Sequence, residues 1–185
     1  GINIKEQMNW KQHLRALLTI NLLWLVYGFL VLIYQSKLPF NPDGNPDMTP
    51  DLAFNTIISF VANCNLQHYS GESGVSYLTQ QFVLMFLQFV SAATGIAAAV
   101  VLFKAFRDKS TAQLGNFYEF FVRSITRLLL PFSIVIALIL TFNGTPASFE
   151  SKDQFISLQG DTVNVSRGPA AQFVAIKHLG TNGGG

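Results

Sequence analysis

The sequence predicts an all-α integral membrane protein made of repeated span–loop–span units. Only 12% of its 185 residues are charged and 50% are hydrophobic, whereas ordinary globular domains carry about 25% charged residues. Three long apolar runs are separated by polar connections, and one short motif occurs twice. The net charge of +2 offers no footprint for nucleic acid, and a single cysteine excludes an internal disulfide.

The three apolar runs are long enough to predict membrane-spanning helices. The first, residues 16–34, carries no charge over 19 positions, and a helix needs about 20 apolar residues to cross a bilayer. With their flanking residues, the runs predict spans at 14–35, 76–104 and 122–142. Pro131 lies early in the third run, where we expect a kink that a membrane helix tolerates.

Basic residues gather on one side of the predicted spans. They precede the first span or lie between the second and third: Lys5, Lys11, Arg15, Lys104, Arg107, Lys109, Arg123 and Arg127. The loop at 35–75 instead holds four acidic residues against one lysine. The positive-inside rule therefore places the basic loop at 104–127 in the cytoplasm and the loops at 35–75 and 143–168 outside.

Between the first two spans, residues 50–62 predict a short helix that enters the membrane without crossing it. Thr49 supplies a hydroxyl at the N-cap, Pro50 suits the first turn, and Asp51 lies beside the positive end of the helix. The apolar run that follows is too short to span a bilayer. We expect this helix to end near Asn63, at mid-depth in the membrane.

The same pattern recurs 119 residues later in the chain. Pro50 aligns with Pro169, and the second copy predicts another short helix at 169–180. The matching apolar positions are three residues apart and therefore share a helix face. A helix that stops at mid-depth directs its partially negative C-terminal end at the membrane centre. Carbonyl groups in the irregular chain that follows can replace the water shell of a cation.

Several motifs make the sequence similar to a known family. They are MNWKQ at 8–12, NPDGNP at 41–46, TPDLAFNT at 49–56, NLQHYSGE at 65–72, RGP at 167–169 and AIKHLGTNGGG at 175–185. Together they resemble the KdpA family, the potassium-binding subunits of the bacterial Kdp potassium pump. The resemblance extends over essentially the whole chain, and its last motif is highly specific.

The resemblance implies a potassium-channel-like fragment of a protein with four span–pore loop–span repeats. The first repeat would occupy 1–112, and an incomplete second repeat would occupy 113–185. Filter strands are implied at 62–67 and 181–185, with an outside loop at 143–168. The implied potassium-binding residues are Asn63, Cys64, Asn65, Thr181, Asn182, Gly183 and Gly184, and the implied supporting residues are Gln67, Thr49, Pro50 and Pro169.

The resemblance also implies a potassium-binding and translocating subunit of an ATP-driven, high-affinity potassium import complex. ATP hydrolysis would belong to a P-type partner subunit, next to small accessory subunits of the Kdp complex. The chain itself would then not be an enzyme and would hold potassium but no other metal, nucleotide or organic cofactor. Its surroundings would be the lipid of a bacterial inner membrane.

Two other functions remain open from the sequence. A stand-alone cation channel or symporter with the same repeats is the first alternative. An intramembrane enzyme using His68, Glu72 and His178 is the second, although all three residues lie near predicted outside loops. The chain has no nucleotide-binding or aspartyl-phosphate motif, so any energy source is expected in a partner.

Some of the candidate residues also have simpler interpretations. Asn63 and Asn65 suit the cap of a buried helix end, because asparagine tolerates left-handed backbone conformations. The glycines at 183–185 also suit a linker, and Cys64 suits a small buried position. We expect Lys177 to face water or an acid, because a positive charge beside a cation filter repels the ion.

Overall fold

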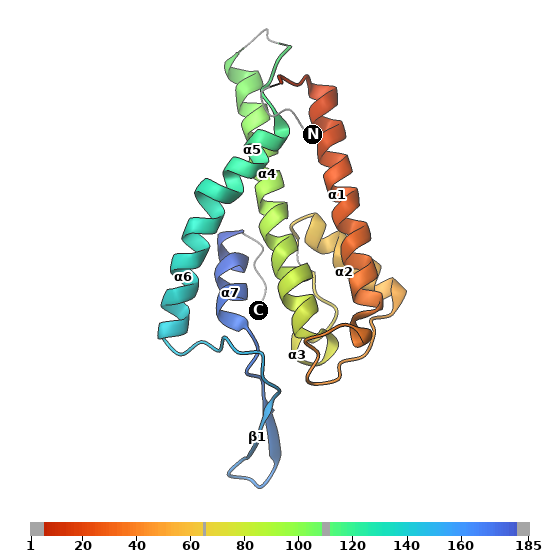
Figure 1. Cartoon of the computed structure of the whole chain (residues 1–185), viewed down its shortest axis with the longest axis vertical. Helices are drawn as coiled ribbons and strands as arrows, with labels where there is room; N and C mark the ends of the chain where they lie inside the picture. The colour runs from red at the N-terminus through yellow and green to blue at the C-terminus, as the bar shows by residue number, and fades with distance from the viewer. Residues whose placement is uncertain (1–5, 65, 109–111, 181–185) are drawn as a thin grey trace.

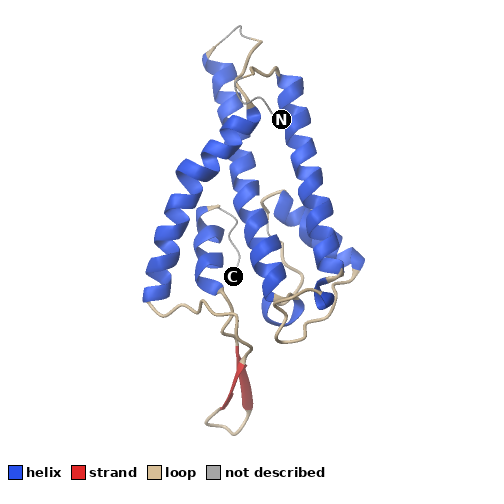
Figure 2. Ribbon diagram, in the orientation of Figure 1, coloured by secondary structure: helices blue, strands red, loops and turns tan. Residues whose placement is uncertain are grey.

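The computed structural model describes residues 6–64, 66–108 and 112–180. Three long apolar helices run along the long axis of the molecule (Figure 1), and helix dominates the described chain (Figure 2). Each is long and apolar enough to cross a membrane. They are α1 (Trp10–Ile33), η2 (Thr79–Met85) continued by α4 (Phe86–Arg107), and α5 (Phe117–Ser124) continued by η3 (Ile125–Leu129) and α6 (Leu130–Phe142).

Two shorter helices lie beside the long ones. They are α2 (Pro50–Val61) and α7 (Ala170–Leu179), and both run alongside one half of the long helices rather than their full length (Figure 1). Smaller elements complete the fold: η1 (Gln35–Lys37), α3 (Gly71–Gly74), β1 (Asp153–Ile156) and β2 (Thr162–Val165). The prediction of a mainly helical fold with three long apolar helices is confirmed.

The third long helix begins at Phe117, earlier than the expected span at 122–142. Asn116 caps it: its side-chain oxygen accepts hydrogen bonds from two N–H groups of the first turn, at 3.0 and 3.3 Å. Arg123 does not end the helix, because it pairs with Glu119 one turn earlier at 2.7 Å. The cap and the ion pair together extend the helix towards its N-terminus.

Pro131 is accommodated by a π-helical turn rather than by a break. Proline has no N–H to donate within a helix. Directly before the proline, the N–H of Leu130 donates to the carbonyl of Ile125, five residues back rather than four, and this bond closes the wider turn of η3. The helix therefore continues through the proline, and α5 and α6 follow different directions on the two sides of η3 (Figure 1).

A two-stranded hairpin, which the sequence did not predict, lies in the predicted outside loop of the otherwise helical fold. Strands β1 and β2 are antiparallel, with Asp153 opposite Val165 and Ile156 opposite Thr162. Nearly all of their side chains are exposed. Each strand has only four residues, so even the alternation of polar and apolar residues at 162–165 is too short to identify a strand.

The end of the molecule away from the hairpin is basic. The start of α1 and the end of α4 lie at this basic end (Figure 1), and they contain Lys11, Arg15, Lys104 and Arg107. The segment before α1 pairs there with the segment before α5. The N–H of Met8 donates to the carbonyl of Gly115 at 2.7 Å, and the N–H of Leu114 donates to the carbonyl of Met8 at 3.0 Å. These bonds join the start of the first long helix to the start of the third.

At the hairpin end, two loops far apart in sequence interlock through Asp43. The backbone N–H of Lys152 donates to Asp43 Oδ1 at 3.2 Å, and its ammonium lies 4.0 Å from Asp43 Oδ2. The Tyr77 hydroxyl donates to the Glu150 carbonyl at 2.9 Å and lies 3.4 Å from the Asp43 carboxylate. The loop after α6 is therefore fixed to the loops on both sides of α2.

The core forms where α1, α2 and η2 meet, and Gly28 makes their close approach possible. A Cβ atom at Gly28 would lie 2.6 Å from Ile57 Cδ1 and 3.1 Å from Val83 Cγ1. Both neighbours are fully buried. Small residues allow such close helix contacts in lipid, where no hydrophobic effect drives helices together.

The long helices differ in how much of their apolar surface is covered. In their most apolar stretches, 44% of the residues of η2–α4 are buried, against 17% in α1 and 11% in α5–α6. Helix α4 is therefore central. The outer two present apolar surface that suits contact with lipid.

Candidate functional site

The start of α2 lies where the sequence places it, although its cap differs from the expectation. Thr49 occupies the N-cap position, Pro50 opens the first turn, and the Ala53 N–H donates to the Thr49 carbonyl at 2.8 Å. The Thr49 hydroxyl makes no capping bond to the helix. It hydrogen-bonds the carboxylate of Asp51 instead, and this bond holds the pKa of Asp51 below its usual value.

The end of α2 is closed by its own backbone. The N–H of Asn63 donates to the Phe60 carbonyl at 3.1 Å, and the N–H of Cys64 donates to the Ser59 carbonyl at 2.9 Å. Asn63 has a φ of 58°, in the left-handed region. This is the Schellman arrangement of a helix C-terminus. Asn63 therefore caps the end of α2, as one interpretation of the sequence predicted, and residues 62–63 form a turn.

The Asn63 side chain also joins the ends of the two short helices. Its Oδ1 accepts a hydrogen bond from Ser91 Oγ of α4 at 2.9 Å. Its Nδ2 donates to the carbonyl of Gly180, the residue that ends α7, at 3.2 Å. One side chain therefore connects two segments that are 117 positions apart in the sequence.

The start of α7 is anchored by backbone and side-chain bonds. The Pro146 carbonyl accepts from the N–H groups of Ala170 and Ala171, both at 3.0 Å. Pro169 is the N-cap residue rather than the first helical residue, and its carbonyl accepts from Gln81 Nε2 at 3.1 Å. The preceding Gly168 has room only for hydrogen, because a Cβ there would lie 2.8 Å from the Tyr77 ring.

Both short helices point their C-terminal ends at the same level of the molecule. Each enters from the hairpin end and stops about halfway along the long helices (Figure 1). A helix C-terminus carries a partial negative charge from its last carbonyl groups. Two partially negative helix ends are thus joined through Asn63, although the last turn of α7 also contains the basic residues Lys177 and His178.

The structure describes only some of the predicted potassium-binding residues. Asn65, Thr181, Asn182, Gly183 and Gly184 lie outside the described residues.

Cys64 and Gln67 are the described residues that follow Asn63 among the predicted site residues of the first loop, and neither is buried. Cys64 is exposed rather than buried, so the expectation of a small buried residue is wrong. A helix that is closed directly before it leaves Cys64 on the turn, outside the packed interface. Gln67 is exposed too, and its Nε2 donates to the Tyr69 hydroxyl at 3.3 Å.

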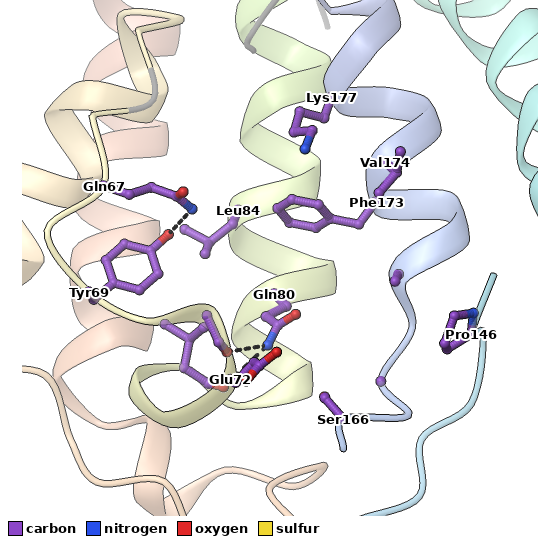
Figure 3. A pocket seen from close by; sticks show the side chains of 14 residues that line it. Gln67, Tyr69, Glu72, Gln80, Leu84, Pro146, Ser166, Phe173, Val174 and Lys177 are labelled. Atoms are coloured by element: carbon purple, nitrogen blue, oxygen red, sulfur yellow. Dashed lines mark hydrogen bonds between the residues drawn. The ribbon is translucent and has the colours of Figure 1, made fainter. Parts of the chain in front are cut away.

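A cavity of about 350 Å³ lies between the segment that follows α2 and helix α7 (Figure 3). Gln67, Tyr69 and Glu72 line one wall, and Phe173 and Lys177 line the other. The Lys177 side chain extends from α7 into this space (Figure 3). Lys177 is only 6% exposed, and Glu72 is the acid that lines the same cavity.

Two adjacent glutamines of η2 hold the two walls of this cavity. Gln80 Nε2 donates to the carbonyl of Gly71, at the start of α3, at 2.8 Å. Gln81 Nε2 donates to the carbonyl of Pro169, at the start of α7. Consecutive side chains of a helix point in different directions, so one π-helical segment contacts both walls. π-Helical segments are frequent at functional sites.

The residues proposed for an intramembrane enzyme are not gathered around this cavity. Glu72 lines it, but neither His68 nor His178 is among its lining residues, and both histidines are exposed. The described residues also contain no group of three or more His, Cys, Asp or Glu side chains that could hold a metal ion.

Sequence reasoning missed the polar residues that position the two short helices. Gln80, Gln81 and Ser91 lie in an uncharged run that was interpreted only as a span. Their polarity was the available signal, because polar side chains within a membrane helix usually bond to a neighbouring element.

The sequence of the chain matches a known family. The model of the family "KdpA: Potassium-transporting ATPase A subunit" matches residues 1–185. A relative from Flavobacterium psychrophilum, named potassium-transporting ATPase potassium-binding subunit, is 64% identical over 185 residues, which are 100% of this chain and 32% of the relative. Proteins of the same name from Bacteroides fragilis and Caldanaerobacter subterraneus are 56% and 45% identical, each over 100% of this chain and 33% of the relative.

The chain thus spans about a third of the length of the curated relatives that it matches. The family match extends over every residue of the chain, including the two short helices and the loops that follow them. The chain belongs to the KdpA family of potassium-transporting ATPase A subunits.

Proposed function

We propose that this chain forms two of the pore loops through which a potassium-import complex binds and selects potassium. The observation that supports this most directly is the bond from Asn63 to the Gly180 carbonyl, which brings the ends of α2 and α7 together. The names of the relatives, potassium-binding subunits of a potassium-transporting ATPase, identify the ion.

In this proposal the ion is held by backbone carbonyls rather than by acidic side chains. The binding positions are Asn63, Cys64 and Asn65 in the first loop and 181–184 in the second. Thr49, Pro50, Gln67 and Pro169 support them. A ring of carbonyl oxygens replaces the hydration shell of the ion. The negative ends of α2 and α7 lower the free energy of a cation at that point.

The complete protein contributes two further loops in the same proposal. Residues 1–112 form the first repeat, and residues 113–185 form the start of the second. A P-type partner subunit hydrolyses ATP, with small accessory subunits beside it, and this chain contributes no catalytic residue. The basic end faces the cytoplasm of a bacterial inner membrane, and both short helices enter from outside.

A stand-alone channel or symporter is the competing function. It shares the carbonyl filter and differs in its energy source. Potassium uptake against a gradient that stops when ATP hydrolysis is blocked supports the ATP-driven complex. Uptake that continues without ATP hydrolysis supports the alternative.

The test of the filter is the substitution Gly183→Asp in the full-length protein within its complex. A carboxylate at this position would disturb the carbonyl ring, so potassium-limited growth and potassium uptake should be lost while membrane insertion is retained. Gly95→Ser is the matched control, because Gly95 has open space around its Cα. Unchanged growth of the Gly183→Asp strain at limiting potassium would contradict the proposal.

A further inference from the structure

Ser91 is a buried polar residue on the central long helix. It lies on α4 and is 6% exposed. A serine or threonine within a helix commonly donates its hydroxyl proton to a backbone carbonyl of the preceding turn. Thr94 follows this rule, because its Oγ1 donates to the Val90 carbonyl at 2.8 Å. The same helix therefore contains a locally bonded hydroxyl with which Ser91 can be compared.

The Ser91 hydroxyl points out of its own helix instead. Its Oγ lies 2.9 Å from Asn63 Oδ1 at the end of α2, and 3.3 Å from the Gln88 carbonyl of α4. A hydroxyl has one proton to donate, and the bond to Asn63 is the shorter of the two. Ser91 thus links α4 to the end of the first short helix.

The direction of this bond follows from the partner on the other side of Asn63. The Gly180 carbonyl can only accept, so the Asn63 amide must present its nitrogen to Gly180, at 3.2 Å. The amide oxygen then faces Ser91, and because that oxygen also only accepts, Ser91 is the donor. Two hydrogen bonds therefore run in one direction, from α4 through Asn63 to the end of α7.

Ser91 supplies an orientation that α2 does not supply by itself. The bonds that close α2 hold the backbone of Asn63, but they do not determine the rotamer of its side chain. Helix α4 contacts both short helices (Figure 1), so a donor on its surface can fix the amide relative to both. With Ser91 and Gly180 at its two ends, the amide has one arrangement that satisfies both partners.

The Gly180 carbonyl belongs to the peptide group through which the chain leaves α7. Gly180 is buried, and its own N–H donates to the Ile176 carbonyl at 2.8 Å. Because a peptide group is planar, holding its carbonyl also sets the direction in which the chain leaves Gly180 for the second proposed loop. The bond from Asn63 thus acts directly on the entry to that loop.

We propose that Ser91 is a positioning residue for potassium selection: it orients the Asn63 amide, which in turn holds the Gly180 carbonyl at the entry to the second pore loop. This role involves no contact between Ser91 and the ion. The effect on potassium rests on the proposed function above, whereas the link from α4 to the ends of α2 and α7 does not.

A simpler role for Ser91 makes a different prediction. Small residues on membrane helices allow close packing, and Ser91 precedes two buried alanines, at 92 and 93. In that role only the size of the side chain matters, and the hydroxyl needs no partner beyond the Gln88 carbonyl. Alanine, which is as small as serine, would then replace Ser91 without loss of function.

The experiment is a double-mutant cycle in the full-length protein within its complex. The variants are Ser91→Ala, Asn63→Gly and the double variant. Asn63→Gly removes the amide but tolerates the left-handed backbone at φ 58°. Thr94→Val is the matched control, because it removes a buried hydroxyl from the same helix and nearly preserves the shape of the side chain.

Transport is measured as the apparent KM and maximal rate of potassium uptake, and as the ratio of potassium to rubidium uptake. Ser91→Ala should raise the apparent KM by about fivefold, as expected for the loss of one hydrogen bond, and should reduce the discrimination against rubidium. The maximal rate should change less than the KM. Thr94→Val should leave the KM and the discrimination unchanged.

The double variant tests whether Ser91 acts through Asn63. If it does, Ser91→Ala should add nothing to the effect of Asn63→Gly. Three outcomes would overturn the proposal: unchanged discrimination in Ser91→Ala, additive effects in the double variant, or an equal change in Thr94→Val.

Hydrogen exchange separates a failed link from a wrong function, because it requires no transport. The Gly180 amide should exchange about threefold to tenfold faster in Ser91→Ala than in the wild type, and no faster in the double variant than in Asn63→Gly. Unchanged exchange in Ser91→Ala overturns the link, whatever the uptake shows. The expected exchange pattern, together with a wild-type complex that takes up no potassium, overturns the proposed function and leaves the link standing.

Discussion

Helices α2 and α7 occupy equivalent places in the fold, but they are held there in different ways. The end of α2 is closed by its own backbone, through the bonds from Asn63 and Cys64 to preceding carbonyls. The end of α7 receives a bond from Asn63 of the other loop, and its start is held by Gln81. The first loop is therefore largely self-sufficient, whereas the second depends on the first.

The two helices also differ in charge at the end that faces the middle of the molecule. The last turn of α2 contains no basic residue, whereas that of α7 contains Lys177 and His178. The repeat in the sequence thus conserves the placement of a short helix while changing its local electrostatics. In the proposed pore, the two loops are therefore not expected to contribute equally to ion binding.

The largest effect is expected at Asn63, where the two loops meet. Asn63→Ala places alanine, which tolerates the left-handed region less well than asparagine, at φ 58°, at a cost of up to about 1–2 kcal/mol. It also removes both side-chain hydrogen bonds, at about 1 kcal/mol each. Asn63→Gly removes the same bonds but tolerates the backbone. Hydrogen exchange of the complete protein should show faster exchange in α2 and α7 for Asn63→Ala, and in α7 alone for Asn63→Gly. Equal loss in both helices for Asn63→Gly would contradict the asymmetry.

A second substitution should disturb the packing where α1 meets α2 and η2, away from α7. In Gly28→Ala the new Cβ would lie 2.6 Å from Ile57 Cδ1, and such overpacking costs about 1–3 kcal/mol. The thermal unfolding midpoint should fall. Adding Ile57→Val removes the Cδ1 atom and should recover most of the loss, whereas Gly95→Ala, with open space around it, should be neutral or stabilising. Failure of Ile57→Val to rescue would show that this contact is not the cause.

A third substitution should disturb the anchor of α7 and spare that of α3. Gln81→Leu removes the donor to the Pro169 carbonyl, with an expected loss of about 1–2 kcal/mol because a buried acceptor is left unpaired. Gln80→Leu is its neighbour and control, since Gln80 bonds to Gly71 of α3 instead. Limited proteolysis between α6 and α7 should accelerate in Gln81→Leu only. The same acceleration in both variants would show that η2 is disturbed as a whole.

The smallest effect is expected at alkaline pH, in the loop that follows α2. Burial raises the pKa of the Tyr69 hydroxyl to about 12, against the opposing effect of the bond from Gln67. The folded state therefore binds the Tyr69 proton more tightly than the unfolded state does. This contribution to stability is fully present below the usual tyrosine pKa of about 10 and is lost as the pH rises towards 12. The unfolding midpoint of Tyr69→Phe should depend less on pH in that window, and an unchanged dependence would exclude Tyr69 as the group responsible.

The apolar runs predicted the long helices well, because crossing a membrane imposes a length and a composition that are visible in the sequence. The start at Phe117 was missed because the residues before 122 include the charged Glu119, which pairs with Arg123 one turn later. The hairpin was missed because β1 and β2 bury almost nothing. Strands of four residues offer too few positions for an alternating pattern to identify them.

The site was predictable in its placement but not in its contacts. The position of Pro50 and the composition of the run after it predicted where α2 begins and ends. The bond from Asn63 to Gly180 depends on how two distant segments meet, and no spacing in the sequence encodes it. For Lys177 the sequence predicted contact with water or an acid, and the structure adds that the side chain is buried in a cavity that Glu72 also lines.

The contact made by Asn63 affects the order in which α2 and α7 become structured. Once α2 is closed, the Asn63 amide is already oriented, so α7 meets a prepared partner and gives up less conformational entropy in docking. The entropy cost of closing the long loop between positions 63 and 180 is then partly offset by this hydrogen bond, because its donor, the Asn63 amide, is already held in place. The two loops therefore become ordered cooperatively, and the first acts as a template for the second.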